Sequence, residues 1–185
     1  MIKKKIGNSM FNAIKIFKDD KDHISCSLNK IDKSELPDNN VLLNIEFSTL
    51  NYKDCLAIAN KSPVVRKFPM VPGIDLAGSV VSSSTNDFSV GQKVVLNGWG
   101  HGEVHWGGLA QMGSIDSKYL IKLPANISTF EAMALGTAGY TATLAILEIE
   151  KKKLNKSKEA ILVTGTGGGV GGIAVSILNT LGYNV

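Results

Sequence analysis

Apolar and polar residues alternate in short runs through the first two thirds of the chain, and this period of two predicts β-strands. Turn-forming Gly, Pro, Asn and Asp residues separate the runs. Strands are expected at 11–17, 41–47, 74–81, 92–97 and 119–123, with one short helix over 52–60. Short strands at close spacing predict a compact, largely antiparallel β domain, a barrel or sandwich.

The pattern changes near Pro124. A capping box at 128–131 opens one helix, and a second helix is expected from 141 to about 152. The continuous apolar run 160–164 predicts a buried parallel strand, followed by a glycine cluster and a helix over 170–181. This order opens a βαβ unit, so the overall class is α/β. A doubly wound sheet needs several such units, and we therefore expect the sequence to be incomplete.

Three segments follow from this pattern. Residues 1–9 form an extension, expected to be disordered, ahead of a β domain at 10–130 that would be catalytic. Residues 131–185 hold connecting helices and the first βα unit of an incomplete nucleotide-binding domain.

Composition excludes several classes of protein. The chain has 185 residues, is 44% hydrophobic and 19% charged, and has a mean hydropathy of +0.09, as ordinary globular proteins do. It has no apolar run long enough to cross a membrane and no secretory signal, so no membrane partner is expected. The net charge of +4 comes largely from lysine runs at 3–5 and 151–153 without interleaved aromatics, so we expect solvated surfaces and no nucleic-acid partner.

The two cysteines, Cys26 and Cys55, form no CxxC or CxxH pattern. This spacing argues against a disulfide framework or a cysteine-rich zinc site and favours a reducing, cytoplasmic location.

The glycine cluster within 163–172 is the strongest local signal, because it lies between an apolar run and a helix. Its glycines fit two registers, 165/168/171 or 167/169/172. Either would let a pyrophosphate approach the positive helix end, although a purely structural turn is the alternative. The residues that separate NAD from NADP would lie beyond position 185.

Metal ligands are missing where this domain order would place them. A β domain ahead of a nucleotide-binding domain is the order of medium-chain dehydrogenases, whose alcohol dehydrogenases use catalytic zinc. Here Asn51 stands where a Cys ligand would be and Ile74 where a His would be, and the four-cysteine lobe is absent. The sequence resembles the zinc-free quinone oxidoreductase branch, and no metal is predicted.

Four motifs narrow this resemblance to the acrylyl-CoA reductase family, the YhdH/AcuI group. They are Ser-Thr-Leu-Asn-Tyr-Lys-Asp (48–54), Phe-Pro-Met-Val-Pro-Gly-Ile-Asp-Leu-Ala-Gly (68–78), Gly-Trp-Gly-His-Gly-Glu-Val-His-Trp-Gly-Gly-Leu-Ala (98–110) and Gly-Thr-Ala-Gly-Tyr-Thr-Ala (136–142). The likeness implies a GroES-like β-barrel domain followed by a truncated Rossmann domain. It also implies NADPH-dependent reduction of acrylyl-CoA to propanoyl-CoA, and a homo-oligomer when full length.

The resemblance assigns residues to this chemistry. It places Tyr52 at the nicotinamide and in catalysis, and Asn51 and Asp54 in the active-site cleft as further catalytic residues. It places Gly167, Gly168, Gly169 and Val170 at the pyrophosphate. For Asn51 and Asp54, capping of the following helix is an equally good interpretation of the residues alone.

Other candidates receive a structural interpretation. His101 and His105, with Glu103 between them, would suit a metal only on a helix, and the flanking glycines argue against one.

Trp99 and Trp106 are expected to pack or to line the cleft. Arg66 and Lys67 are expected to be exposed loop cations, with contacts to CoA phosphates as the alternative.

Two other functions remain open at this stage. The first is a general NADPH:quinone or enone reductase with the same fold and cofactor. The second is an inactive truncated remnant or a structural protein. In every case, we expect the 185-residue chain by itself to lack activity, since most of the cofactor side is absent.

Overall fold

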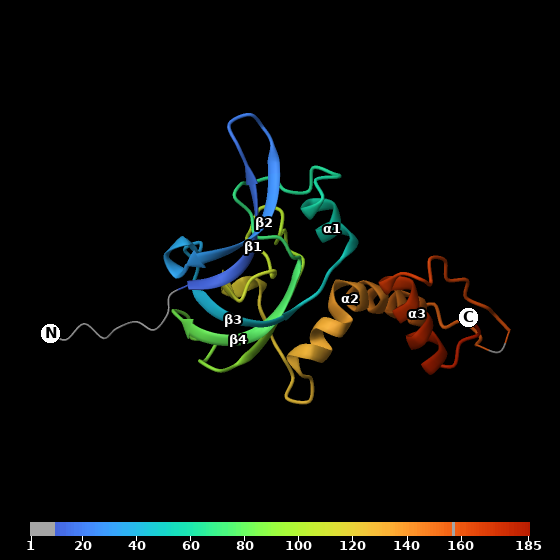
Figure 1. Ribbon diagram of the computed structural model, residues 1–185. Coiled ribbons are helices and arrows are strands. Elements are labelled where there is room, and N and C mark those ends of the chain that lie inside the picture. The colour runs from blue at the N-terminus through green and yellow to red at the C-terminus, as the bar shows by residue number, and fades with distance from the viewer. Residues whose placement is uncertain (1–9, 157) are drawn as a thin grey trace. The chain divides into compact units, whose positions relative to one another are not determined.

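The computed structural model describes residues 10–156 and 158–185 (Figure 1). The chain divides into two compact units, and the boundary between them in the sequence lies between Met133 and Ala134. The expected extension at 1–9 lies outside the described residues.

The first unit is an antiparallel β domain, as the alternating pattern predicted. A hairpin of β1 and β2 pairs in register from Met10 opposite Asp32 to Lys18 opposite Ile24. A second sheet has the strand order β6-β3-β4-β5-β7, with antiparallel neighbours throughout. The strands are β1 (Met10–Lys18), β2 (Ile24–Asp32), β3 (Val41–Ser48), β4 (Asp75–Ser83), β5 (Lys93–Asn97), β6 (Met112–Ile115) and β7 (Ile121–Lys122).

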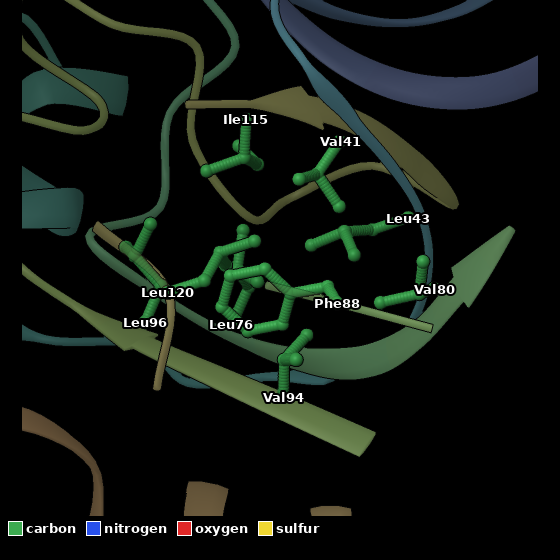
Figure 2. Close-up of a cluster of buried hydrophobic side chains, with 9 residues drawn as sticks. All are labelled: Val41, Leu43, Leu76, Val80, Phe88, Val94, Leu96, Ile115 and Leu120. Atoms are coloured by element: carbon green, nitrogen blue, oxygen red, sulfur yellow. The ribbon is translucent and has the colours of Figure 1, made fainter. Parts of the chain in front are cut away.

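One hydrophobic cluster holds the five-stranded sheet together. Its side chains come from β3, β4, β5 and β6 and from the loops that carry Phe88 and Leu120, and they converge in Figure 2. The members are Val41, Leu43, Leu76, Val80, Phe88, Val94, Leu96, Ile115 and Leu120. Because each is almost completely buried, this cluster supplies much of the apolar burial that stabilises the unit.

Gly78 allows β3 and β4 to approach closely. A Cβ at this position would lie 2.0 Å from the backbone oxygen of Asn44, and the register shifts between Ile45 and Phe47 on the facing strand. Gly78 therefore marks both a close backbone approach and an irregularity in the pairing, as a glycine inside a strand often does.

Short helical turns connect the strands of the first unit. Helix α1 (Tyr52–Ile58) ends two residues earlier than predicted. Two 3₁₀ turns occupy Lys33–Glu35 and Ser117–Tyr119. The second of these overlaps the strand expected at 119–123 only at Tyr119, and the strand itself is the shorter β7.

Helix α2 (Thr129–Lys151) begins with the predicted capping box. The backbone N–H of Ser128 donates to Glu131 Oε2 at 2.8 Å, and that of Glu131 donates to Ser128 Oγ at 3.1 Å. Length and composition alone would let this 23-residue helix cross a membrane. However, Gly136 breaks it with φ 52° and ψ −159°, and the remaining 137–151 is shorter than the roughly 20 residues that a span needs.

The strand predicted at 160–164 is wrong for the described chain. The run makes a single parallel bridge, Ala160 to Asn184, with Ile161 N–H donating to Asn184 O at 2.8 Å. Leu162 is 89% exposed. A buried parallel strand needs neighbours on both sides, and the described residues offer it only the stretch around Asn184.

Helix α3 (Gly169–Thr180) follows the glycine turn close to where the pattern placed it. Leu178 packs with Ile146 of α2 and with Tyr183, and this small cluster is the core of the second unit.

Candidate active site

The N-terminus of α1 holds all three residues assigned to catalysis. Tyr52 is the first residue of the helix, and its side chain is 80% exposed. Asp54 is buried, and its carboxylate accepts the backbone N–H of Asn51 at 2.8 Å and that of Ile74 at 3.0 Å. The geometry is that of a capping box, so both Asn51 and Asp54 have the capping contacts that the sequence suggested.

Burial governs the ionisation of Asp54. Desolvation raises the pKa of this carboxyl above its ordinary value, and the two backbone N–H donors partly oppose it. The negative charge of Asp75 raises the pKa further. The site therefore contains two buried carboxylates that influence each other.

Asp75 lies at the centre of a side-chain network that the sequence analysis did not find. Its Oδ2 accepts the Thr49 hydroxyl and the Asn51 amide, both at 2.8 Å, and its Oδ1 accepts the Asn97 amide at 2.8 Å. The Asn51 amide also donates to Thr49 Oγ1 at 2.8 Å. The available signal was a charged residue at the head of the apolar run Ile74–Ala77.

The glycine-rich loop 98–109 packs against the backbone next to Asp75. A Cβ at Gly107 would lie 2.1 Å from Gly73 O, and one at Gly108 would lie 2.2 Å from Asp75 O. Only glycine permits this approach, which places the loop directly beside the network.

An ion pair joins the same loop to α1. Lys53 Nζ lies 2.7 Å from a Glu103 carboxylate oxygen. Lys53 directly follows Tyr52, so this contact adds a second attachment near the exposed tyrosine.

His101, in this loop, is buried, and burial lowers its pKa to about 4. Its Nδ1 lies 3.1 Å from Gly98 O, and since a carbonyl oxygen accepts, the neutral ring carries its proton on Nδ1. His105 and Tyr119 stack near it, with ring centroids 5.3 Å from that of His101 in both cases. The loop is a turn rather than a helix, as its glycines predicted. Within 10–156 and 158–185, no group of three or more His, Cys, Asp or Glu side chains lies close enough to hold a metal.

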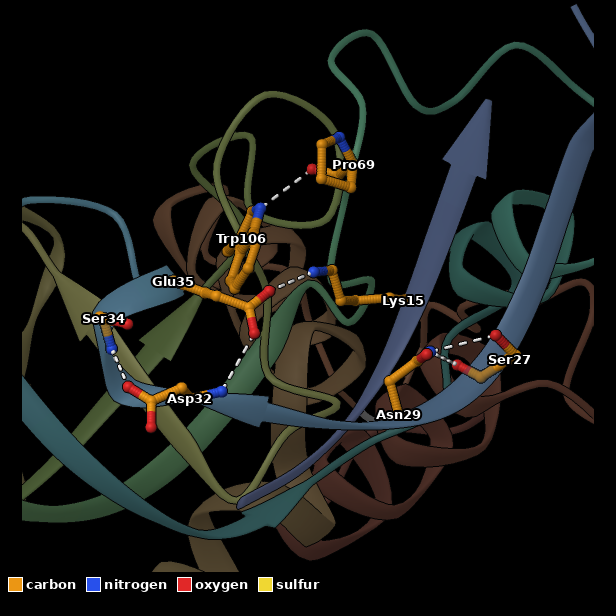
Figure 3. A network of polar contacts seen from close by, with 8 residues as sticks. All are labelled: Lys15, Ser27, Asn29, Asp32, Ser34, Glu35, Pro69 and Trp106. Carbon is orange, nitrogen blue, oxygen red and sulfur yellow. Dashed lines mark hydrogen bonds and ion pairs between the residues drawn. The ribbon is translucent and has the colours of Figure 1, made fainter. Parts of the chain in front are cut away.

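The two tryptophans of the loop differ in their surroundings. Trp106 Nε1 donates to Pro69 O at 3.0 Å, and its ring lies 5.2 Å from the Lys15 ammonium (Figure 3). Lys15 is buried and pairs with Glu35 at 2.8 Å. Packing is thus the role of Trp106, whereas Trp99 is 65% exposed, with its ring 6.0 Å from that of Tyr119 and tilted by 33°.

The loop cations behave as expected from the sequence. Arg66 and Lys67 are both exposed. Lys67 also lines a cavity with His105 and Lys118. Lys118 is paired with Asp116 at 2.7 Å, so Lys67 is the more available of the two lysines to an anionic ligand.

The second unit contains the glycine turn. Gly165 adopts a positive φ of 69°, Gly168 is the N-cap of α3, and a Cβ at Gly171 would lie 2.4 Å from Gly165 O. These three positions carry the steric requirements, which favours the 165/168/171 register. Gly169 and Val170 are the first residues of α3, and Gly167 lies in the exposed turn before them.

Known proteins match both units. The family model for the alcohol dehydrogenase GroES-like domain matches residues 37–125. The acrylyl-CoA reductase AcuI of Ruegeria pomeroyi is 44% identical over 95% of this chain and 54% of its own length. A chloroplast envelope quinone oxidoreductase homologue of Arabidopsis thaliana is 37% identical over 75% of this chain and 43% of its own length.

Solved structures also match the chain over most of its length. The yhdH oxidoreductase of Salmonella enterica, in complex with NADP, superimposes with a TM-score of 0.88 at 42% identity, covering 93% of this chain and 53% of that one. The Bacillus subtilis protein yhfP, with NAD bound, gives a TM-score of 0.88 at 40% identity, covering 95% and 53%. Over most of its length the chain is therefore similar to proteins of the YhdH/AcuI group of medium-chain dehydrogenases/reductases.

These matches confirm the predicted fold class, a GroES-like β domain followed by the start of a Rossmann domain. The YhdH/AcuI resemblance drawn from the four sequence motifs is also confirmed. The chain spans about half the length of the relatives and solved structures it matches.

Proposed function

We propose that the chain forms the substrate-side domain and the phosphate-binding turn of a longer NADPH-dependent reductase that converts acrylyl-CoA to propanoyl-CoA. The observation that carries the proposal is the exposed Tyr52 on a helix start that buried carboxylates hold in place. The 44% identity to an acrylyl-CoA reductase supports this substrate.

The glycine turn fits the phosphates of such a cofactor. Gly171 can approach Gly165 O because it has no Cβ, and an added Cβ at Gly167 would meet nothing within 4 Å, which leaves open space before α3. The first N–H groups of a helix lack intrahelical acceptors and attract anions. We assign the pyrophosphate to Gly167, Gly168, Gly169 and Val170.

The reaction is a conjugate reduction that needs no metal in this proposal. NADPH bound at the glycine turn would supply the hydride for the β-carbon, and the C=C π-electrons would shift toward the thioester oxygen. The Tyr52 hydroxyl donates a hydrogen bond to this enolate oxygen, and a proton from Tyr52 or water completes the α-carbon. Asn51 and Asp54 hold Tyr52 in place.

We also assign the protein to the cytoplasm, consistent with the free thiols of Cys26 and Cys55.

Turnover by the purified protein that contains this chain tests the proposal. Acrylyl-CoA with NADPH should yield propanoyl-CoA, and Tyr52→Phe should lower kcat by about a hundredfold. Cys55→Ser, an exposed change on the same helix, is the matched control and should leave kcat unchanged. NADPH oxidation followed with mass spectrometry of the thioester measures both.

The competing function is a general quinone or enone reductase, favoured by the 37% identity to the chloroplast quinone oxidoreductase homologue. Quinone turnover equal to or faster than acrylyl-CoA turnover would establish it instead. Comparable binding of both substrate classes without turnover of either would exclude both enzymes.

A further inference from the structure

We infer that Asp75 is the positioning residue of this site: it fixes the start of α1, and thereby Tyr52, through Asn51 and Thr49. The inference rests on the proposed function, since it names how the residue that meets the substrate is held.

The first step is the buried carboxylate itself. Asp75 is completely buried, and its negative charge raises the pKa of the Asp54 carboxyl. Thr49, Asn51 and Asn97 donate to its two oxygens. These donors lie directly after β3, at the N-cap of α1 and at the end of β5.

These donations set the direction of the bond between Thr49 and Asn51. The Thr49 hydroxyl gives its single proton to Asp75 Oδ2, so its oxygen accepts from the Asn51 amide. Asn51 Nδ2 lies 2.8 Å from Asp75 Oδ2 and 2.8 Å from Thr49 Oγ1, so the two contacts hold the Asn51 side chain in one orientation.

The backbone then transmits the position to Tyr52. The carbonyl of Asn51 accepts the N–H groups of Asp54 at 2.9 Å and Cys55 at 3.2 Å, which are the first bonds of α1. Tyr52 directly follows Asn51 and is 80% exposed, so its place follows mainly from the backbone of the N-cap. Asp75 holds this N-cap through the Asn51 side chain, and Asp54 holds it through the Asn51 backbone N–H.

A double-mutant cycle between Asp75→Asn and Tyr52→Phe tests this in the protein that contains the chain. An asparagine offers one acceptor oxygen to three donors, so the network must rearrange. We expect Asp75→Asn to lower kcat about tenfold when Tyr52 is present and less than about twofold in the Tyr52→Phe background, because residues that act through each other are non-additive. An equal loss in both backgrounds overturns the inference.

Ser48→Ala is the matched control. Ser48 Oγ donates to the backbone oxygen of Asp75 at 2.7 Å, so this variant removes a neighbouring bond without touching the carboxylate. Its effect should be additive with Tyr52→Phe. If Asp75→Asn does not fold, Thr49→Val removes one donor to the same oxygen and should show the same non-additivity at smaller size.

Hydrogen exchange separates this inference from the proposed function. If the wild type reduces neither acrylyl-CoA nor a quinone, the proposed function fails, and the positioning role is judged by the amides of Asp54 and Cys55. Faster exchange of both in Asp75→Asn than in Ser48→Ala supports positioning of α1. Unchanged exchange overturns it.

Discussion

At the scale of single residues, the structure answers one question that the sequence left open. Asn51 and Asp54 fitted catalysis and helix capping equally well, and their contacts are those of a cap. Asp54 also accepts the N–H of Ile74, a residue twenty positions later, so it ties α1 to the start of β4. No local pattern could reveal this bond, because its partner is set by the tertiary fold.

His101 gives a residue-scale prediction about pH. Its pKa of about 4 in the folded state lies below the ordinary value near 6.5, because burial disfavours the charged ring. Between these values the unfolded chain binds the extra proton, so stability is present above pH 6.5 and is lost as the pH falls toward 4. Between pH 7.5 and 5, this group alone should remove about 2 kcal/mol from the free energy of unfolding.

Urea unfolding of His101→Asn against the wild type measures this loss. Both tryptophans, Trp99 and Trp106, lie in the first unit, so their fluorescence reports on it. The variant should show a smaller fall between the two pH values, whereas His23→Asn, on the β1–β2 turn, should match the wild type. Equal falls in all three proteins would contradict the assigned pKa.

At the scale of elements, the sequence was informative wherever one face of a strand is buried. The alternating run at 11–17 became β1, and Val41 and Leu43 of the run at 41–47 are core residues of β3. The strand predictions missed β2, although Ile24, Cys26 and Leu28 alternate with Ser25, Ser27 and Asn29; this strand is largely exposed and pairs with β1 in a hairpin. They also missed β6, a four-residue strand containing Gly113 that forms by pairing with β3. A pairing partner far along the chain, rather than local propensity, creates β6.

Gly78 gives the element-scale prediction. In Gly78→Ala, the new Cβ would overlap the backbone oxygen of Asn44, so β3 and β4 must separate or the strand must shift. We expect a loss of at least about 3 kcal/mol in the free energy of unfolding. Ser82→Ala on the same strand changes an exposed side chain and should stay within about 0.5 kcal/mol of the wild type. Denaturant unfolding of both variants measures the two losses. Similar free energies of unfolding for Gly78→Ala and Ser82→Ala would mean that the sheet accommodates a methyl group at this contact.

At the scale of the whole molecule, the two units differ in how completely their backbones are paired. The first has a two-stranded hairpin and a five-stranded antiparallel sheet with a buried core. The second rests on two helices, a small cluster around Leu178 and one parallel bridge. The apolar run at 160–164 is typical of a strand buried in a parallel sheet, yet it forms no strand here, because the described chain does not supply its neighbours. A continuous apolar run therefore predicts a parallel strand only where neighbouring strands are present, and the run itself does not reveal whether they are.

Hydrogen exchange on the 185-residue chain tests this difference. The amides of Leu162, Val163 and Thr164 should exchange near the rate of an unfolded peptide, because the run is bridged only at Ala160 and Leu162 is almost fully exposed. The amides of Leu43 and Val80, inside the sheet, should exchange only through global unfolding. In the longer protein that we propose, further parallel strands would pair with this run, and its protection should rise toward that of the sheet. If the amides of 162–164 in the 185-residue chain are as protected as that of Leu43, the second unit completes its own sheet, for example by pairing with a second copy. The longer protein is then not needed for this strand to form.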